Sequence, residues 1–426
     1  MFVFKNFADI HTYLDDLVSR DDPRHKAYML DRMKVLMDYL GNPQDRYNVI
    51  HVAGTSGKTS TCYYLTALLG EGNNKVGLTV SPHVSEVNER VQIDGQPLEE
   101  ATFCKEFGLF MRAIEQSKVS PTYFELFVAF AFWEFARQKV DNAVVEVGVG
   151  GLLDGTNVMT RSDKVCVITD IGYDHTRLLG DTLPDIAAQK AGIILPRNAV
   201  FCFRQGEEVM QTIREVSREK AADLHEIIPT PVGPGHLPSF QRRNWQLART
   251  VYEYLAKRDA LTTLDAARLN HAAHTRVPAR METVYFSSKT LVLDGAHNPQ
   301  KLDALAKSLR EIYPHQAIAG MVAFARTKSN KIHDNLEAFL SVTSHLVITS
   351  FLNEQTGNHS TEPQLIGEQC DVLGYKNYEI KPGAAAALEH LLERPEPVLL
   401  ITGSFYLLQR IRPLIIKDDD TSYRRH

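Results

Sequence analysis

The sequence predicts an α/β protein, with a larger domain on a mainly parallel sheet followed by a smaller α/β domain. Apolar, β-branched runs alternate with segments of helical periodicity along most of the chain, which is typical of a parallel sheet with helices on both faces. The length of 426 residues exceeds the size at which a single core keeps growing. A proline- and glycine-rich stretch, residues 229–239, interrupts the alternation. These observations together predict two domains.

The first elements are two helices and then a strand that leads into a helix through a glycine-rich turn. Apolar residues follow helical spacing over residues 7–40. The run YNVIHVAG, residues 47–54, predicts a strand that ends in glycine. A helical pattern then extends from Lys58 to Leu69. The order strand, turn, helix therefore begins the sheet of the first domain.

The same order recurs downstream. A helix is expected over residues 121–140, and strands are expected within 141–151 and 164–175. A new strand, turn and helix begin at residues 289–312, and further strands are expected at 345–350 and 397–404. We therefore expect domains at 1–283 and 284–426. The polar tail after Ile416 is assigned no structure.

Composition limits the class of protein and its partners. Hydrophobic residues make up 44% and charged residues 23%, which is ordinary for a globular protein. The net charge of −5 gives no global attraction to nucleic acid or to an anionic membrane. The five cysteines are scattered without C-x-x-C spacing, which argues against a disulfide framework or a cysteine zinc site. No apolar run reaches the roughly 18 residues of a membrane span, so we expect a cytoplasmic protein that binds neither nucleic acid nor membranes.

Residues 51–65, HVAGTSGKTSTCYYL, have the character of a phosphate-binding loop, but the glycine spacing is short. The common pattern G-x-x-x-x-G-K-[ST] would place its first glycine at Val52, whereas the glycine present is Gly54. Backbone N–H groups at such a turn converge near a helix N-terminus, where the helix dipole favours an anion. Lys58 would lie by the β- and γ-phosphates, with the Thr59 and Ser60 hydroxyl groups nearby. A glycine-rich turn with a solvated lysine is the alternative.

Two carboxylates and one imidazole, those of Glu146, Asp174 and His175, are expected at strand ends. Glu146 interrupts an apolar run, and a buried carboxylate needs a cation or a hydrogen-bond donor. Asp174 and His175 are expected to close the following strand, at the edge where open α/β sheets bind ligands. Oxygen ligands favour Mg²⁺, and the histidine leaves Mn²⁺ open.

Seven ordered blocks of sequence resemble the folylpolyglutamate synthase/dihydrofolate synthase family of the Mur ligase superfamily. The resemblance covers most of residues 45–300 and parts of the C-terminal region, and the ATP loop of this family has the short glycine spacing found here. It implies a Mur-ligase-like P-loop central domain and a smaller C-terminal domain. The blocks are HVAGTSGKTSTCYYL, GLTVSPHVSEVNERVQIDGQPL, PTYFELFVAFAF, VVEVGVGGLLDGTNV, ITDIGYDHTRLLGDTLPDIAAQKAGII, LDGAHNP and LLITGSFYLL.

The resemblance also implies a reaction and its participants. Members of this family use ATP and magnesium, with two ions expected, to convert a carboxylate into an acyl phosphate. The α-amine of L-glutamate then attacks the acyl phosphate to form an amide. The expected acceptor is a folate or dihydropteroate, and we expect a monomer.

Site residues are carried over from the matching blocks. Lys190 matches a lysine that many of these ligases carry as a carbamate, although an ordinary surface lysine is the alternative. Tyr123 and Phe124 lie where the family has its pterin pocket, while the other aromatic residues of that helix are expected in the core. The catalytic set is Lys58, Glu146, His175 and Lys190; the metal set is Ser81, Glu146, His175 and Lys190. The nucleotide set is Gly54, Thr55, Ser56, Gly57, Lys58, Thr59, Ser60, Gln241, Asn244, Arg280, Asp294 and His297; the substrate set is Pro82, His83, Tyr123, Phe124 and Asp154.

Three positions depart from the pattern of the folate enzymes. Ser56 stands where they usually have asparagine, and Thr59 where they usually have glycine. Lys328 lacks the flanking aspartates of the family. A Mur-type ligase acting on a non-folate carboxylate, such as a cell-wall precursor, is therefore the main alternative. A GTPase-like switch, for which no N-K-x-D element is evident, and a non-catalytic relative that only binds ATP or folate are further alternatives.

Overall fold

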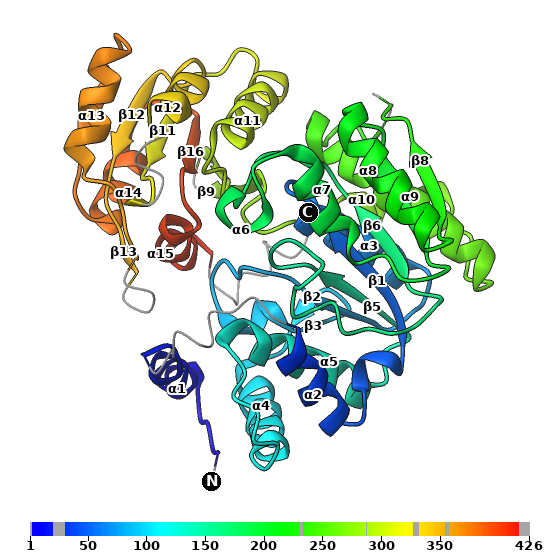
Figure 1. Cartoon of the computed structure of the whole chain (residues 1–426). Coiled ribbons are helices and arrows are strands. Elements are labelled where there is room, and N and C mark those ends of the chain that lie inside the picture. Colours follow the sequence, from blue (N-terminus) through cyan, green and yellow to red (C-terminus); the bar gives the residue numbers. More distant parts are fainter. Residues whose placement is uncertain are drawn as a thin grey trace. The chain divides into compact units, whose positions relative to one another are not determined.

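The computed structural model describes residues 2–19, 30–230, 233–286, 288–326, 332–353 and 358–416. Lys328 and residues 417–426 lie outside these ranges. The chain divides into two compact units (Figure 1). The first unit comprises Met1–His83, Val87–Leu237 and Gln241–Thr275, and the second comprises Val84–Glu86, Pro238–Phe240 and Arg276–His426. The main part of the second unit thus begins eight residues before the boundary at 284 that the sequence suggests.

The first unit is built on an eight-stranded sheet in the order β4-β3-β2-β5-β1-β6-β7-β8. Neighbouring strands from β2 to β8 in this order are parallel, and β3 and β4 are antiparallel additions at one edge. The predicted mainly parallel sheet is confirmed. The strands are β1 (Asn48–Ala53), β2 (Val76–Thr79), β3 (Gln92–Ile93), β4 (Gln96–Pro97), β5 (Asn142–Glu146), β6 (Val165–Ile168), β7 (Ala199–Phe203) and β8 (Asp223–Ile227).

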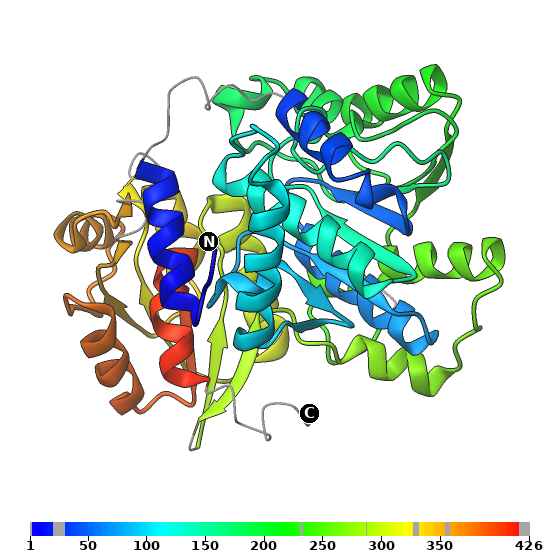
Figure 2. The ribbon, with the colours of Figure 1, turned by 90° about the horizontal axis from the view of Figure 1, so that it is seen from below.

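Helices cover both faces of this sheet. On one face, α4 and α5 pack with Val49, Ala143 and Val145, and α7 and α8 pack with alternate residues of β6 and β7. The amino-terminal helix α1 lies beside α4 (Figure 2). The rings of Phe7 on α1 and Phe103 on α4 meet edge to face. The helices of this layer are α1 (Phe7–Ser19), α2 (Asp31–Tyr39), α4 (Glu100–Ile114), α5 (Tyr123–Gln138), α7 (Leu183–Ala191) and α8 (Glu207–Glu219).

The opposite face carries α3 (Lys58–Glu71), α9 (Ser239–Arg258) and α10 (Ala266–Ala273). Helix α3 contacts β1, β2 and β5, and α10 packs against α3. The rings of Tyr64 on α3 and Trp245 on α9 meet edge to face at 5.4 Å. Short helices lie in the connections: η2 (Pro43–Asp45), η3 (Val87–Arg90) and α6 (Thr176–Leu179).

The second unit has a six-stranded sheet in the order β15-β12-β11-β16-β10-β9, in which only β9 is antiparallel. Helices α11, α12 and α13 pack on one face, and α14 and α15 on the other. The strands are β9 (Glu282–Phe286), β10 (Lys289–Leu293), β11 (Ile318–Val322), β12 (His345–Ile348), β15 (Tyr378–Ile380) and β16 (Val398–Thr402), with a separate pair, β13 (Leu352–Asn353) and β14 (Asn358–His359). The helices are α11 (Pro299–Ile312), α12 (Ile332–Leu340), α13 (Pro363–Val372), α14 (Ala384–Glu393) and α15 (Phe405–Ile415).

The topology of the first sheet gathers chemistry at one edge. Strand β1 is central, with β5 on one side and β6 on the other. These three strands are parallel, so the loops that follow their carboxyl ends lie at the same edge. Within the described ranges, no helix is long and apolar enough to cross a bilayer.

A buried ion pair anchors α15 in the second unit. The Arg412 guanidinium donates from Nε and Nη2 to Glu282 Oε1 at 3.2 and 2.9 Å, and from Nη1 to Ser85 Oγ at 2.7 Å. The Glu282 side chain is 1% exposed. A carboxylate at such a position is costly to leave without a counter-charge.

Replacing Arg412 with alanine should therefore destabilise the second unit by about 3 kcal/mol, because the buried Glu282 carboxylate loses its cation. Native-state hydrogen exchange of peptides from β9, β10 and α15 measures this local free energy directly. Arg249→Ala is the matched control, since the Arg249–Glu253 pair on α9 is exposed and should contribute under about 1 kcal/mol. Equal effects of the two substitutions would contradict the prediction.

Candidate functional site

The loop after β1 is fastened to the end of β6. The Thr55 and Ser56 amides donate to the carbonyl oxygen of Asp170 at 2.8 and 3.2 Å. Gly54 has φ +152°, and a Cβ atom there would lie 1.8 Å from Thr169 Oγ1, so no other residue fits. The sequence suggested that these amides point at a ligand. They instead hold the loop, because the neighbouring strand offers them a carbonyl acceptor.

The loop leads directly into the amino end of α3. The first helical hydrogen bond runs from Thr61 N to Gly57 O, so the N–H groups of the residues before Thr61 in the first turn lie ahead of the helical ladder. Gly57 caps the helix with φ +90° and without a side-chain cap. The helix N-terminus therefore presents donors and a positive dipole at this edge of the sheet.

Two ammonium groups meet at one carbonyl oxygen in this loop. Lys58 Nζ donates to Gly54 O at 3.0 Å, and Lys190 Nζ donates to the same atom at 2.9 Å. Lys190, on α7, is only 4% exposed, which rules out an ordinary surface lysine. Two cations and the amino end of α3 together make this place strongly attractive to a polyanion.

Glu146 lies at the end of β5, beside the same loop. It is 3% exposed, and its Oε1 atom accepts a hydrogen bond from Thr59 Oγ1 at 2.9 Å. Its Oε2 atom accepts from the Ser81 amide at 3.3 Å. The structure thus brings Glu146, Ser81 and Thr59 together, with Ser81 in contact through its backbone amide. The carboxylate and hydroxyl oxygens of Glu146 and Thr59 are of the kind that Mg²⁺ prefers.

The expectation that Asp174 and His175 close the β6 strand is wrong. Strand β6 ends at Ile168, and His175 is the residue before α6, in a left-handed conformation with φ +50°. The His175 side chain is about half exposed, and its Nε2 atom lies 3.9 Å from Asp174 Oδ1. The strand ends before Thr169 and Asp170, because the backbone groups of these two residues hydrogen-bond to the end of β1 and to the loop that follows it.

The face of α9 toward the loop carries two of the expected nucleotide residues. Gln241 and Asn244 are buried on this helix. A Cβ atom at Gly57 would lie 2.5 Å from Asn244 Oδ1, so the carboxamide of Asn244 rests directly on the loop. Arg243, next to Asn244 on the same helix, donates from Nη2 to Asp170 Oδ1 at 2.6 Å. Helix α9 therefore contacts both the loop after β1 and the segment after β6.

His83 and Arg90 form a buried pair in the first unit. Arg90 Nε donates to His83 Nδ1 at 2.9 Å, which fixes His83 as a neutral imidazole with its proton on Nε2. Burial lowers the pKa of His83 well below its ordinary value, and the charges of Arg90 and His11 lower it further. The Arg90 guanidinium lies over the Tyr123 ring at 5.2 Å. The exposed Pro82 precedes this pair, after a cis peptide bond from Ser81.

Asp154 and Phe124 are packed together at the loop after β5. A Cβ atom at Gly148 would lie 2.5 Å from the Phe124 ring and 3.2 Å from Asp154 Oδ2. Both Asp154 oxygens accept hydrogen bonds, Oδ2 from the Val149 amide and Oδ1 from the amide and hydroxyl of Thr156. Burial raises the pKa of Asp154 despite these bonds. Asp154 thus organises the loop from within.

The remaining three expected residues belong to the second unit. Asp294 and His297 lie in the turn between β10 and α11, and Arg280 lies just before β9. Asp294 is buried and accepts from the amides of Met281 and Ala296, both at 2.8 Å. His297 Nδ1 donates to Gly295 O at 2.7 Å, which leaves Nε2 as an acceptor. The Arg280 guanidinium lies 4.6 Å from the centre of the Phe405 ring. Burial raises the pKa of Asp294, and Arg280 opposes this shift.

Sequence reasoning missed three charged residues of the first unit. Arg90 lies inside a recognised block but carries no local signal that it is buried. Asp170 and Arg243 are 73 residues apart in the chain, so their pairing becomes visible only in three dimensions.

Comparisons with known proteins agree with this architecture. Residues 52–226 match the family model of the Mur ligase middle domain, and residues 279–405 match that of the Mur ligase glutamate ligase domain. The chain is 30% identical over 418 residues to a folylpolyglutamate synthase of Lacticaseibacillus casei, covering 90% of this chain and 94% of that protein. It is 29% identical over 413 residues to a dihydrofolate synthase/folylpolyglutamate synthase of Bacillus subtilis, with the same coverage.

A solved structure of Mycobacterium tuberculosis folylpolyglutamate synthase, complexed with ADP and AMPPCP, superposes with a TM-score of 0.82. It is 26% identical and covers 97% of this chain and 98% of its own. The likeness thus extends over both units.

Two buried histidines make the stability of the first unit depend on pH. Burial lowers the pKa of His51 well below its ordinary value, with Lys164 adding to the effect, and His83 behaves likewise. As pH falls below about 6.5, the unfolded chain takes up protons at both residues while the folded chain does not. We therefore expect full stability above this pH and a loss below it of about 1.4 kcal/mol per pH unit for each histidine.

Urea unfolding followed by tryptophan fluorescence measures this loss, because Trp133 and Trp245 both belong to the first unit. His83→Gln should remove about half of the slope below pH 6.5. His271→Gln, at a histidine that is 81% exposed, should leave the slope unchanged. A slope that is the same in all three proteins would contradict the assignment.

Proposed function

We propose that this chain, which belongs to the folylpolyglutamate synthase/dihydrofolate synthase family of Mur ligases, is an ATP-dependent ligase that adds L-glutamate to a folate, to dihydropteroate or to both. The names of its relatives support this activity. The ADP and AMPPCP bound to the M. tuberculosis enzyme support ATP as the nucleotide.

One observation carries the proposal: the convergence of Lys58, Lys190 and the amino end of α3 at the Gly54 carbonyl, next to Glu146. A triphosphate offers the negative charge that this set of cations and amides stabilises. Ser56 adds a buried hydroxyl that has no hydrogen-bond partner within the described ranges. A phosphate oxygen beside the loop would provide that partner.

The proposed reaction transfers an acyl group to L-glutamate by way of an acyl phosphate. An oxygen of the acceptor carboxylate attacks the γ-phosphorus of ATP, and the bond to ADP breaks. The α-amine of L-glutamate then attacks the acyl carbon, phosphate leaves with the bonding electrons, and the nitrogen loses a proton. The chain contributes chiefly by positioning the reactants and by offsetting the charge that moves onto the phosphates, for which Lys58 is suitably placed.

The oxygen atoms around Glu146 fit a magnesium ion. The carboxylate is oriented by Thr59 and Ser81, and Mg²⁺ takes such oxygen ligands together with phosphates and water. Magnesium bound there would neutralise part of the phosphate charge. We propose Ser81 and Glu146 as ligands of one ion, and His175 with a carbamate form of Lys190 for a second.

His83, Arg90 and Tyr123 are proposed to contact the acceptor substrate. The guanidinium of Arg90 is buried against Tyr123, and such a group pairs well with a carboxylate or stacks on a flat ring. In the neutral His83 the proton is on Nε2, which makes that atom the donor of the ring. Together they provide a cation, a donor and an aromatic ring, which suits a pterin acid.

The direct experiment is mass spectrometry of products formed from ATP, L-glutamate and either dihydropteroate or tetrahydrofolate. A product heavier by one or more glutamyl residues is expected with at least one pterin. A cell-wall precursor serves as the comparison acceptor. Product formed only with that precursor, or ADP release that no pterin stimulates, would refute the folate assignment.

Gly57→Ala should weaken ATP binding by about tenfold or more, because alanine at φ +90° is strained and its Cβ atom would meet Asn244 Oδ1 at 2.5 Å. Equilibrium binding of AMPPCP measures the effect. Gly70→Ala is the matched control on the same helix, since a Cβ atom there meets nothing within 4 Å. The double variant Gly57→Ala with Asn244→Ala should recover part of the loss, and no loss in the single variant would contradict the loop geometry.

Lys190→Arg tests the carbamate. Arginine retains the positive charge but is not expected to form a carbamate, so turnover should fall on the order of a hundredfold. Wild-type turnover should also rise with added bicarbonate after its removal, and the variant should not respond. Lys105→Arg, at a side chain that is 73% exposed, is the control. Full activity of Lys190→Arg would show that Lys190 acts as a simple cation.

A further inference from the structure

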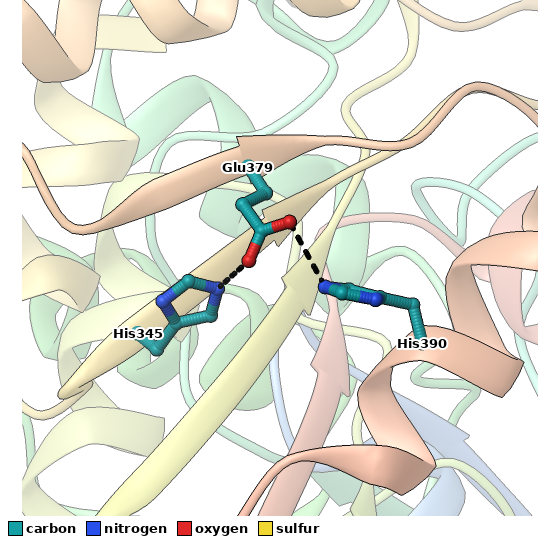
Figure 3. Close-up of side chains that lie close together, drawn as sticks. All are labelled: His345, Glu379 and His390. Carbon is teal, nitrogen blue, oxygen red and sulfur yellow. Dashed lines mark ion pairs between the residues drawn. The ribbon is translucent and has the colours of Figure 1, made fainter.

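Three side chains of the second unit converge at one edge of its sheet (Figure 3). His345 comes from β12, Glu379 from the edge strand β15 and His390 from α14. His345 Nε2 lies 3.4 Å from Glu379 Oε1, and His390 Nε2 lies 3.1 Å from Glu379 Oε2. One ligand atom from each residue can be chosen so that all three lie within 4.8 Å of one another.

The tautomer of His345 is set by its neighbour Asn377. The Asn377 side-chain amide nitrogen donates to the Ser344 carbonyl, which fixes the orientation of the carboxamide. Asn377 Oδ1 then lies 3.1 Å from His345 Nδ1 and accepts its proton. In the neutral imidazole, Nε2 therefore carries a lone pair on the side of the Glu379 carboxylate. A hydrogen bond that orients a histidine in this way is typical of metal-binding histidines.

Neither imidazole satisfies its second nitrogen through a hydrogen bond. The Nε2 atoms of His345 and His390 are both buried, and neither has a hydrogen-bond partner in the part of the chain that the structure describes. The short contacts to Glu379 are close in distance, but their angles are not those of hydrogen bonds. His345 as a whole is 3% exposed, so water is a poor substitute. Buried nitrogen atoms beside a carboxylate and without hydrogen-bond partners call for a cation.

The basic residues near Glu379 leave room for a metal cation. Arg394 is held by Glu396 through two hydrogen bonds at 3.2 and 3.1 Å, and lies 4.0 Å from Glu379. Lys381 lies 3.5 Å from Glu379 Oε2 at a side chain that is 40% exposed. The carboxylate oxygens of Glu379 thus face both imidazoles as well as these two basic side chains.

We propose that His345, Glu379 and His390 bind a divalent transition-metal ion of the zinc class. Zinc bonds of about 2.0–2.2 Å in a tetrahedron place neighbouring ligand atoms roughly 3.3 Å apart. Here the contacts of 3.4 and 3.1 Å run to the two different oxygen atoms of Glu379, and one ligand atom from each of the three residues lies within 4.8 Å of the other two. Two imidazoles and one carboxylate leave the fourth position to water, and the partly exposed His390 and Glu379 give access. Magnesium and calcium are unsuited, because they prefer oxygen ligands.

The ion would join three elements of the second unit. Strand β15 is the edge strand and, among the described residues, pairs with β12 alone, while α14 covers one face of the sheet. A metal bound by one residue from each ties the edge strand and the helix to the sheet. The site is therefore structural, and its occupancy should govern the local stability of this edge.

The test uses the full chain after treatment with a chelator, dialysis and titration with zinc chloride. Wild-type protein should bind one more equivalent of zinc than His390→Gln or Glu379→Gln does. Zinc at ten times its dissociation constant should slow hydrogen exchange in β15 and α14 about tenfold in the wild type, and leave the variants unchanged. His271→Gln, which removes an exposed histidine 2.5 Å from Glu71, should retain the wild-type response.

Circular dichroism of the metal-free proteins shows whether each variant folds. His390 and Glu379 are partly exposed, so substitutions at these two positions allow the test even if a substitution at the buried His345 prevents folding. Zinc binding equal in wild type and variants would overturn the proposal. So would the absence of zinc-dependent protection at β15 and α14, which would leave an ion-pair cluster only. Both readouts are independent of ligase activity, so they stand whether or not the proposed function does.

Discussion

The carbonyl oxygen of Gly54 organises the first unit's site, because two ammonium groups donate to it. One comes from the helix that follows the loop and the other from α7, so a single acceptor joins β1, α3 and α7. The loop cannot shift toward β6 to release them, since Thr55 and Ser56 are already bonded to Asp170, nor toward α9, where Asn244 rests on Gly57. Positive charge is thus concentrated on a rigid backbone, which is the preorganised state that phosphoryl transfer requires.

Much of this arrangement could be predicted from the sequence because parallel strands end at one edge. The strand before Gly54 and the carboxylate of Glu146 are both visible as local patterns, and topology alone brings them together. The position of His175 could not be predicted, because an apolar pattern does not show where a ladder stops. Strand β6 ends at Ile168, where Asp170 turns its backbone to the neighbouring loop. Pairings between distant segments, such as Arg243 with Asp170, leave no trace in local sequence.

The cluster in the second unit shows a different limit. Metal sites are recognised in a sequence by short, regular spacings of cysteine or histidine. His345, Glu379 and His390 come from three separate elements of the second unit, and no such spacing relates them. The scattered spacing of the cysteines bears on cysteine ligands alone and says nothing about histidine. Only the pairing of β12 with β15, together with the position of α14, makes the group visible.

The two loop residues that depart from the family pattern, Ser56 and Thr59, can be explained by their environment in this fold. At position 59, where the resemblance leads us to expect glycine, the threonine hydroxyl donates to Glu146 Oε1. A glycine could not make this bond, so in this chain the helix itself holds one oxygen of the carboxylate while the Ser81 amide holds the other. Ser56 replaces a longer asparagine and keeps a buried hydroxyl on the loop. Both changes lie in the loop and the first turn of α3, where the proposed nucleotide and metal ligands are. The departures therefore bear on the proposed positions of the phosphates and magnesium more directly than on the proposed acceptor site around His83 and Arg90.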